Sequence, residues 1–190
     1  MNRNILHLDL DTFFVSCERL ADSSLVGKPV IVGGTGDRGV VSAASYESRK
    51  FGVHSGMPMK MARQLCPNAT YIRGNASIYT KYSKTVTEIL QEQVPVLEKA
   101  SVDEFYADLT GMDRFFGCYK FAKELRSRII KETGLPISFG LSVNKTVSKV
   151  ATNEAKPDSQ LKIDAGFEKI FLEPLSIKKI PMVGEKTFRT

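Results

Sequence analysis

Cysteine is scarce in this sequence, and its placement excludes two kinds of small domain. The three cysteines, Cys17, Cys66 and Cys118, are odd in number, lie far apart and form no CxxC pair. Such a pattern predicts neither a disulfide framework nor a structural zinc site. Three isolated thiols fit a reducing compartment, so we expect a cytoplasmic protein.

Long apolar runs are also missing. The first residues begin like a secretory leader, but His7, Asp9 and Asp11 interrupt the apolar core that a leader needs. No later run of apolar residues approaches the length that crosses a bilayer. We therefore expect no leader, no membrane span and no membrane partner.

The rest of the composition is that of an ordinary globular protein. The chain has 190 residues, of which 42% are hydrophobic and 25% charged, enough for one or two compact domains. Its 27 Lys and Arg against 21 Asp and Glu give a formal net charge of +6. This charge favours an anionic partner such as a nucleic acid without requiring one.

Hydrophobic periodicity predicts an α+β fold. Residues 5–11 alternate apolar with polar, which predicts a strand with Asp9 and Asp11 on one face. Further along, the pattern predicts a helix over residues 75–94, a hairpin over 96–109, a helix over 113–132, a strand over 137–142 and a helix over 145–154. This order of elements is the split-βαβ, ferredoxin-like arrangement, an antiparallel sheet with helices on one face.

A second, smaller unit is inserted after the first strand. Residues 28–32 and 40–43 flank a glycine-rich turn and predict a β-hairpin, which a short helix follows. The glycines lack the Lys-Ser or Lys-Thr ending and the immediately following helix of a phosphate-binding P-loop, so we do not predict one. The expected domains are residues 1–17 with 75–165, the inserted α+β unit at 18–74, and the start of a third unit at 166–190.

Four carboxylates are predicted to meet at one edge of the main sheet. Asp9 and Asp11 lie on one strand, and Asp103 and Glu104 lie in the hairpin that we expect beside it. Clustered carboxylates destabilise one another unless cations neutralise them. Oxygen ligands suit Mg²⁺ or Mn²⁺, and two such ions about 4 Å apart serve phosphoryl transfer. From spacing alone, solvated hairpin residues are an equally good interpretation.

A basic helix face follows the acidic motifs. Lys145 and Lys149 lie one helical turn apart, a spacing that suits contacts with the phosphates of a nucleic-acid backbone. From the charge pattern alone, a solvated helix face is the better interpretation. The function of these lysines therefore depends on evidence from the rest of the chain.

Several motifs in the sequence resemble the Y-family of translesion DNA polymerases. They are His7 to Phe14 (HLDLDTFF), Ser16-Cys17-Glu18, Lys28-Pro29-Val30, residues 44–53 (ASYESRKFGV), Ser101 to Glu104 (SVDE) and Lys156-Pro157 before Gln160. The motifs occur in the family's order and cover nearly the whole chain, from Ile5 to Lys186. The pattern is most similar to the DNA polymerase IV branch, although Ser16-Cys17-Glu18 also resembles the mutagenesis-protein branch.

The resemblance implies a DNA-directed DNA polymerase of the lesion-bypass type. Such an enzyme transfers deoxynucleotides onto a primer 3′ end with low fidelity and serves DNA repair and damage tolerance. The ferredoxin-like unit would be the palm, residues 18–74 the fingers, and residues 166–190 the start of the thumb. Nothing in the sequence resembles a proofreading exonuclease.

The resemblance also implies a metal site. Asp9, Asp103 and Glu104 would be the catalytic side-chain ligands of two Mg²⁺ ions, with Mn²⁺ as an alternative. The main-chain carbonyl of Leu10 would be a further ligand, and Asp11 would lie behind the ligands.

Nucleotide and DNA contacts are implied in the same way. Phe14 would be the steric gate that excludes a ribose hydroxyl. The other nucleotide contacts would be Phe13 and the triphosphate-binding residues Tyr46, Arg49 and Lys156. Lys145 and Lys149 would contact primer–template DNA, and Ser55, Gly56 and Met57 would cover the nascent base pair.

Two positions depart from the family pattern. Ala43 replaces a threonine whose hydroxyl would reach the triphosphate, a loss of about 1 kcal/mol unless Ser42 supplies the hydrogen bond. Met182 stands where a glycine is usual, and by the resemblance we expect the remaining thumb and a further DNA-gripping domain to lie outside residues 1–190. We therefore expect a monomer that binds primer–template DNA weakly and extends it poorly, with any sliding clamp recruited through the missing regions.

Two other functions stay open at this point. A nucleotide or diguanylate cyclase also uses paired carboxylates and two Mg²⁺ ions on a ferredoxin-like sheet. Ser101 to Phe105 resembles the Gly-Gly-Asp-Glu-Phe signature of such cyclases, but the two glycines are missing. A catalytically inactive DNA-binding module would keep the fold but would have no need for a costly acidic cluster.

Overall fold

The computed structural model describes residues 3–34, 36–112 and 117–188, and the chain divides into two compact units. The first unit comprises the chain up to Asp11 and from Thr85 onward, and the second comprises Thr12–Lys84. The expected start of a helix at residue 113 lies outside the described residues.

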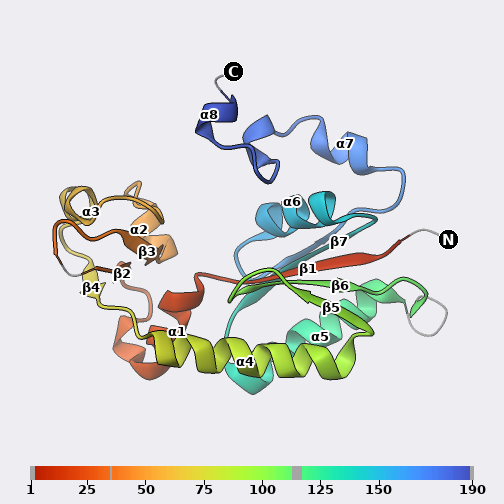
Figure 1. Ribbon diagram of the computed structural model, residues 1–190, viewed down its shortest axis with the longest axis horizontal. Helices are drawn as coiled ribbons and strands as arrows, with labels where there is room; N and C mark the ends of the chain where they lie inside the picture. The colour runs from red at the N-terminus through yellow and green to blue at the C-terminus, as the bar shows by residue number, and fades with distance from the viewer. Residues whose placement is uncertain (1–2, 35, 113–116, 189–190) are drawn as a thin grey trace. The chain divides into compact units, whose positions relative to one another are not determined.

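A five-stranded sheet forms the centre of the first unit (Figure 1). Its strands, in spatial order, are β5 (Val96–Lys99), β6 (Glu104–Asp108), β1 (Ile5–Leu10), β7 (Ile137–Ser142) and β8 (Gln160–Lys162). The first four pair antiparallel, as predicted for a ferredoxin-like sheet. The additional β8 runs parallel to β7, because the chain crosses over through a helix between them. The sheet is therefore mixed, whereas the sequence predicted a wholly antiparallel one.

The strand register sorts the side chains of this sheet into an apolar and a polar face. Leu8 lies opposite Phe105 on one neighbouring strand and opposite Phe139 on the other, and all three side chains are fully buried. Residues that oppose one another in antiparallel strands share a face, so these side chains form one continuous apolar layer. Helix α5 (Cys118–Thr133) lies on this side of the sheet and contributes its own buried residues, Ala122, Leu125 and Ile129, to the core.

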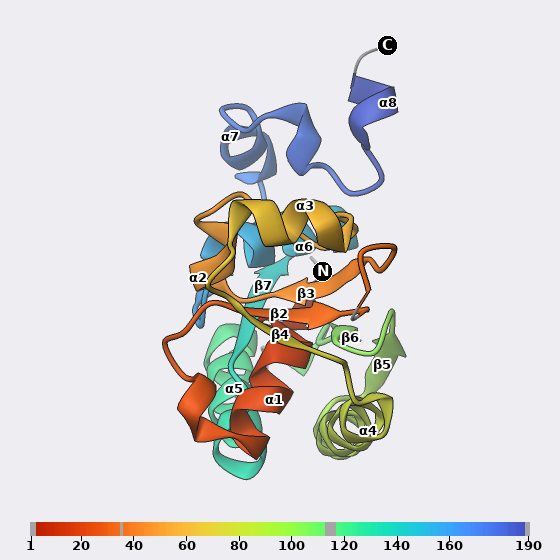
Figure 2. The same cartoon turned by 90° about the vertical axis from the view of Figure 1, so that its left-hand side faces the viewer.

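Helix α6 (Lys145–Ala155) covers the opposite, polar face. The Ser148 hydroxyl donates a hydrogen bond of 2.7 Å to the carbonyl of Ile5, and the Thr152 hydroxyl lies 2.8 Å from Nδ1 of His7. Figures 1 and 2 both show α5 and α6 on opposite sides of the sheet. Helix α6 thus adds a cover on the second face of the predicted ferredoxin-like fold, and its hydroxyl groups give buried polar groups of that face hydrogen-bond partners.

The second unit contains a three-stranded sheet in the order β3, β2, β4. Its elements are α1 (Phe13–Ala21), the 3₁₀ helix η1 (Ser23–Leu25), β2 (Val30–Gly33), β3 (Val41–Ala44), α2 (Tyr46–Arg49), α3 (Met59–Leu65) and β4 (Thr70–Ile72). Strands β2 and β3 form the predicted hairpin, and β4 adds parallel to β2. Ile31, Val53 and Met59 lie in the core of this unit. Helix α4 (Ala76–Gln93) then leads the chain back into the first unit.

Three short helices follow β8. They are α7 (Glu168–Leu172), η3 (Ile177–Lys179) and α8 (Glu185–Phe188). Phe171 and Leu172 pack against a buried cluster of Val147, Ala151 and Ile163. Within the described parts of the chain, no helix combines the length and the apolar character needed to cross a bilayer.

Met182 has an unusual backbone conformation. Its φ is 69°, in the left-handed region that favours glycine, and its side chain is 98% exposed. Met182, which stands where the family usually has glycine, therefore adopts a strained backbone conformation that a glycine would adopt without strain.

Gly140 in β7 allows α6 to approach the sheet closely, and this contact generates a stability prediction. A Cβ atom at Gly140 would lie 2.1 Å from the carbonyl oxygen of Ser148 and 2.7 Å from the main-chain nitrogen of Thr152. Helix backbone cannot swing aside as a side chain can, so we expect Gly140→Ala to lower the free energy of unfolding by about 2 to 3 kcal/mol. Urea unfolding followed by circular dichroism measures this change.

The matched control is Gly36→Ala. A Cβ at Gly36 would meet no atom within 4 Å, so the free energy of unfolding should change by less than about 0.5 kcal/mol. Equal stability of the two variants would contradict the close packing of α6 on β7.

Candidate functional site

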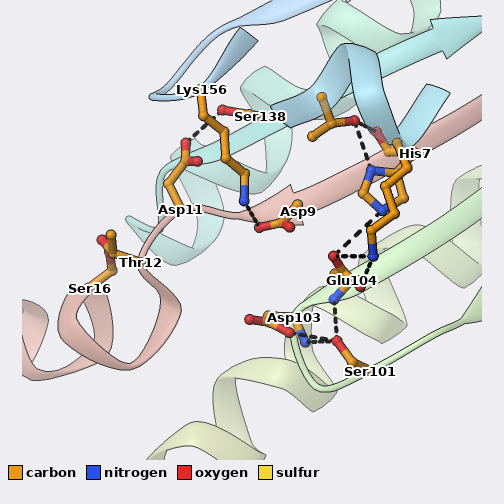
Figure 3. Close-up of polar contacts among 12 residues, drawn as sticks. His7, Asp9, Asp11, Thr12, Ser16, Ser101, Asp103, Glu104, Ser138 and Lys156 are labelled. Atoms are coloured by element: carbon orange, nitrogen blue, oxygen red, sulfur yellow. Dashed lines mark hydrogen bonds and ion pairs between the residues drawn. The ribbon is translucent and has the colours of Figure 1, made fainter. Parts of the chain in front are cut away.

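Three acidic residues of the first unit meet at one corner of its sheet. Asp9 and Glu104 oppose one another in the register of β1 and β6, so their side chains share a face. The main-chain N–H of Leu10 donates a hydrogen bond of 3.0 Å to the carbonyl of Asp103, which fixes the hairpin end beside the end of β1. Figure 3 shows Asp9, Asp103 and Glu104 around this strand end.

Asp9 is the most buried of the three carboxylates, with an exposed fraction of 7%. Burial is the largest cause that raises the pKa of Asp9, to about 7; Lys156 opposes this shift, and the charges of Glu104 and Asp103 add to it. The Lys156 ammonium lies 2.5 Å from Oδ1 of Asp9. A cation beside Asp9 is therefore needed to keep this carboxylate ionised at neutral pH.

Glu104 has a cation of its own. The Lys149 ammonium lies 2.8 Å from both carboxylate oxygens of Glu104. Burial alone would raise the pKa of Glu104, but the hydrogen bonds and the charge of Lys149 outweigh it, and the pKa is lowered. Lys149, proposed from the sequence as a DNA contact, thus points toward the acidic corner.

Ser101 ties the hairpin end that carries Asp103. Its hydroxyl donates a hydrogen bond of 2.6 Å to Oδ1 of Asp103 and accepts from the main-chain N–H groups of Asp103 and Glu104 (Figure 3). Sequence reasoning assigned no separate role to Ser101, although it begins the SVDE motif. A serine two residues before an aspartate is a common turn signal, so this contact was open to prediction.

Asp11 turns away from the other three carboxylates. Its Oδ2 accepts one hydrogen bond of 2.7 Å from the Ser138 hydroxyl and another of 2.7 Å from the main-chain N–H of Asp158. Strand β1 ends at Leu10, so the alternation that would have aligned Asp11 with Asp9 does not continue. The predicted meeting of four carboxylates is therefore a meeting of three, and Asp11 braces the strands behind them.

The donor set fits hard divalent cations. Within the described residues, no three His, Cys, Asp or Glu side chains are gathered tightly enough to hold a metal ion as they stand. Asp9 and Glu104 instead hold the ammonium groups of Lys156 and Lys149, which shows that both carboxylates attract cations. Carboxylate oxygens on two paired strands, with a main-chain carbonyl at hand, suit Mg²⁺ or Mn²⁺ far better than zinc.

His7 lies two residues before Asp9 on the same strand face. Burial is the main cause that lowers the pKa of His7 to about 3, so the imidazole is neutral. Its ring packs on Tyr106 with a centroid distance of 4.6 Å, and Nε2 lies 3.9 Å from Oε1 of Glu104. Sequence reasoning noted His7 without assigning it a function.

Lys145 is more open than Lys149. Its ammonium pairs with Glu98 on β5 and lies 5.2 Å from the centre of the Tyr106 ring. The side chain is 53% exposed, against 26% for Lys149. The two lysines that share a helix face therefore have different surroundings.

In the second unit, α2 brings Tyr46 and Arg49 together. Ser45 begins this helix, and its side chain accepts a hydrogen bond of 3.2 Å from the main-chain N–H of Ser48. Arg49 donates a hydrogen bond of 3.0 Å from Nε to the carbonyl of Ala44, and its guanidinium lies 5.1 Å from the centre of the Tyr46 ring. One basic and one hydroxyl-bearing side chain are thus presented by the same short helix.

Phe13 and Phe14 have different surroundings. Phe13 is 3% exposed and belongs to the core, whereas Phe14 is half-buried. Phe14 stacks on Tyr79 with ring centres 4.2 Å apart and an interplanar angle of 10°. The Tyr79 hydroxyl in turn donates a hydrogen bond of 2.5 Å to Glu18. The sequence did not predict a role for Tyr79, because Tyr79 lies 61 positions after Glu18 and no local pattern links the two residues.

The segment expected to cover a base pair is divided. Ser55 and Gly56 are exposed, and Gly56 has a φ of +85°. Met57 is 4% exposed and packs inside the second unit. Ser55 and Gly56 are therefore the only small exposed residues of this three-residue segment. Ala43, which departs from the family pattern, is buried opposite Val32.

Comparison with known proteins gives a family match over most of the chain. The family described as impB/mucB/samB matches residues 8–153. A protein named DNA polymerase IV from Dehalococcoides mccartyi is 46% identical over 187 residues, which are 97% of this chain and 48% of the relative. One of the same name from Treponema denticola is 45% identical over 182 residues, 95% of this chain and 46% of the relative. The chain thus spans about half the length of these curated relatives.

Solved structures give the same picture for the fold. The crystal structure of DinB from Sulfolobus solfataricus superposes with a TM-score of 0.92 at 30% identity, over 98% of this chain and 55% of that one. The insertion ternary complex of Dbh DNA polymerase superposes with a TM-score of 0.89 at 30% identity, over 96% of this chain and 55% of that one.

The role of Asp11 as a brace can be tested by unfolding. Asp11→Ala leaves the Ser138 hydroxyl and the Asp158 N–H without their acceptor, so we expect a loss of about 1 to 3 kcal/mol in the free energy of unfolding. Asp164→Ala is the control, because Asp164 is 64% exposed in its pair with Lys162 and should contribute less than about 0.5 kcal/mol. Chemical denaturation of both variants measures these changes. Equal losses of unfolding free energy in the two variants would refute the bracing role of Asp11.

Proposed function

The chain belongs to the impB/mucB/samB family, and on this basis we propose that it carries the catalytic part of a lesion-bypass DNA polymerase. The reaction is template-directed transfer of a deoxynucleotide onto a primer 3′ end. The observation that carries the proposal is the pairing of Asp9 with Glu104 across β1 and β6, with Asp103 held beside them. The relatives named DNA polymerase IV support the same assignment.

The two units have natural counterparts in such an enzyme. We assign the ferredoxin-like part, residues 1–17 with 75–165, as the palm and residues 18–74 as the fingers. Residues 166–190 are assigned as the start of the thumb. The division of the chain at Asp11 and at Lys84 is compatible with a palm interrupted by a separate unit.

Asp9, Asp103 and Glu104, with the main-chain carbonyl of Leu10, would hold two Mg²⁺ ions, or Mn²⁺ in their place. When bound, such ions activate an attacking hydroxyl and stabilise the charge that develops on pyrophosphate. The protein's own contribution is positional: the register of β1 and β6 keeps Asp9 and Glu104 side by side. Burial of Asp9 strengthens its attraction for any cation that arrives.

The lysines at the acidic corner have distinct proposed roles. Lys156 would bind the triphosphate of the incoming nucleotide, and its present contact with Asp9 keeps the ammonium at the corner where a phosphate would be needed. The Lys149 ammonium is paired with Glu104, so it would have to leave this carboxylate to bind a DNA phosphate. Lys145 is exposed enough to meet a DNA phosphate directly.

Residues of the second unit are proposed to select the nucleotide. Phe14 would be the steric gate against a ribose hydroxyl, and Tyr79 stacks on it from behind. Phe13 lies in the core and would act through the packing of Phe14. Tyr46 and Arg49 would bind the triphosphate. The exposed Ser55 and Gly56 would leave room for a damaged template base, which implies low fidelity.

Primer extension tests the proposed activity. The chain is mixed with labelled primer–template DNA, four deoxynucleoside triphosphates and Mg²⁺, and it is compared with a chimera in which it replaces the matching part of the Dehalococcoides mccartyi relative. We expect weak extension by the chain, strong extension by the chimera, and a loss of at least about 100-fold with Glu104→Gln. Lys120→Gln, on the exposed face of α5, is the control.

Two results would contradict the proposal. A chimera that folds but does not extend the primer would favour an inactive DNA-binding module. Cyclic products from GTP alone, without a template, would favour the cyclase.

Sugar selection tests the assignment of Phe14. Phe14→Val removes part of the ring without altering the core position of Phe13, so incorporation of ribonucleotides relative to deoxynucleotides should rise at least about 10-fold in the chimera. Phe167→Val, at a residue 59% exposed, is the matched control and should leave the ratio unchanged. If Phe14→Val leaves the ratio of ribonucleotide to deoxynucleotide incorporation unchanged, Phe14 is not the steric gate.

A further inference from the structure

His7 combines complete burial with an unsatisfied polar atom. Among the side chains that the structure describes, only His7 Nε2 and Ser142 Oγ are buried without a hydrogen-bond partner. His7 has an exposed fraction of 0% and lies in the interior of the sheet, between Tyr106 and Gly140 on the neighbouring strands. Buried polar atoms in folded proteins are almost always paired, so the unpaired Nε2 of His7 needs a physical explanation.

The imidazole of His7 is held firmly in place. Its Nδ1 lies 2.8 Å from the Thr152 hydroxyl, and its ring packs on Tyr106. These contacts aim Nε2 toward Glu104, whose Oε1 is 3.9 Å away. That distance is about an ångström longer than a hydrogen bond, so a small movement of the Glu104 carboxylate would close it.

The surroundings of the ring also favour one tautomer. The Thr152 hydroxyl has one proton to donate. Besides Nδ1 of His7, the carbonyl oxygens of Ser148 and His7, 2.9 and 3.2 Å from the hydroxyl oxygen, could accept it. A bare lone pair on Nε2 would face the negative Glu104 carboxylate, whereas an Nε2–H group faces it favourably. The second arrangement requires Thr152 to donate to Nδ1.

We propose that His7 carries its proton on Nε2 and is a positioning residue that, together with Lys149, orients Glu104 for the divalent cations. Lys149 donates to both carboxylate oxygens of Glu104 at 2.8 Å, and an Nε2–H of His7 would face Oε1 from 3.9 Å. Hydrogen bonds of this kind from behind a metal ligand fix its orientation. The inference rests on the proposed function, because it concerns a carboxylate assigned to the metal site.

The tautomer can be read directly in the unmodified chain. The sequence has two histidines, His7 and the exposed His54, so ¹⁵N-imidazole spectra contain two rings, and His54→Gln identifies which is which. We expect a protonated Nε2 and an unprotonated Nδ1 for His7, with the Nε2 signal moving when Mg²⁺ is added. A proton on Nδ1, or a signal that does not respond to Mg²⁺, would overturn the proposal.

Matched substitutions separate positioning from mere packing. Glutamine places its amide nitrogen near the position of Nε2, asparagine places it near Nδ1, and phenylalanine keeps the ring without either nitrogen. By Mn²⁺ titration with electron paramagnetic resonance, His7→Gln should bind within about 3-fold of the unaltered chain. His7→Asn and His7→Phe should bind about 10 to 100-fold more weakly.

The same titration distinguishes failure of this inference from failure of the proposed function. Weak binding by Glu104→Gln together with full binding by folded His7→Phe would overturn the role of His7 alone. Full binding by Glu104→Gln would overturn the metal site and this inference with it. Circular dichroism establishes that each variant is folded before it is titrated.

Discussion

The pairing of β1 with β6 is the constraint on which the rest of the site depends. It sets Asp9 opposite Glu104, and the hydrogen bond from Leu10 to Asp103 holds the third carboxylate at the same strand end. A slip of one residue would turn Asp9 into the apolar layer and bring a leucine to the acidic corner. The buried leucines of β1 prevent that slip, because they would lose the core on the other face.

Balance of charge is the second constraint at this corner. Three carboxylates that meet at a half-buried strand end need positive charge, and Lys149 and Lys156 supply it from α6 and from the residue after α6. The same helix provides Thr152 for His7 and Ser148 for β1. Gly140 permits the close approach that makes these contacts possible. Helix α6 therefore serves both the fold and the chemistry of the proposed metal site.

Local patterns predicted most of the fold and the acidic corner. Alternation in β1 identified the strand and the shared face of its polar residues, and apolar periodicity identified α4, α5 and α6. The three-residue β8 is too short to show alternation and exists only because it pairs with β7. The turn of Asp11 toward Ser138 and the stacking of Phe14 on Tyr79 join residues that are distant in sequence. No local pattern encodes such contacts, whereas the motifs of the family did indicate where the acids, the basic residues and Phe14 would be needed.

A crystal of the chain grown with Mn²⁺ and a deoxynucleoside triphosphate tests the central claim most directly, because anomalous scattering locates each manganese ion. We expect two ions in contact with Asp9, Asp103 and Glu104, and the Lys156 ammonium moved from Asp9 to the triphosphate. Ions bound elsewhere, with the Lys156 ammonium still on Asp9, would contradict this claim.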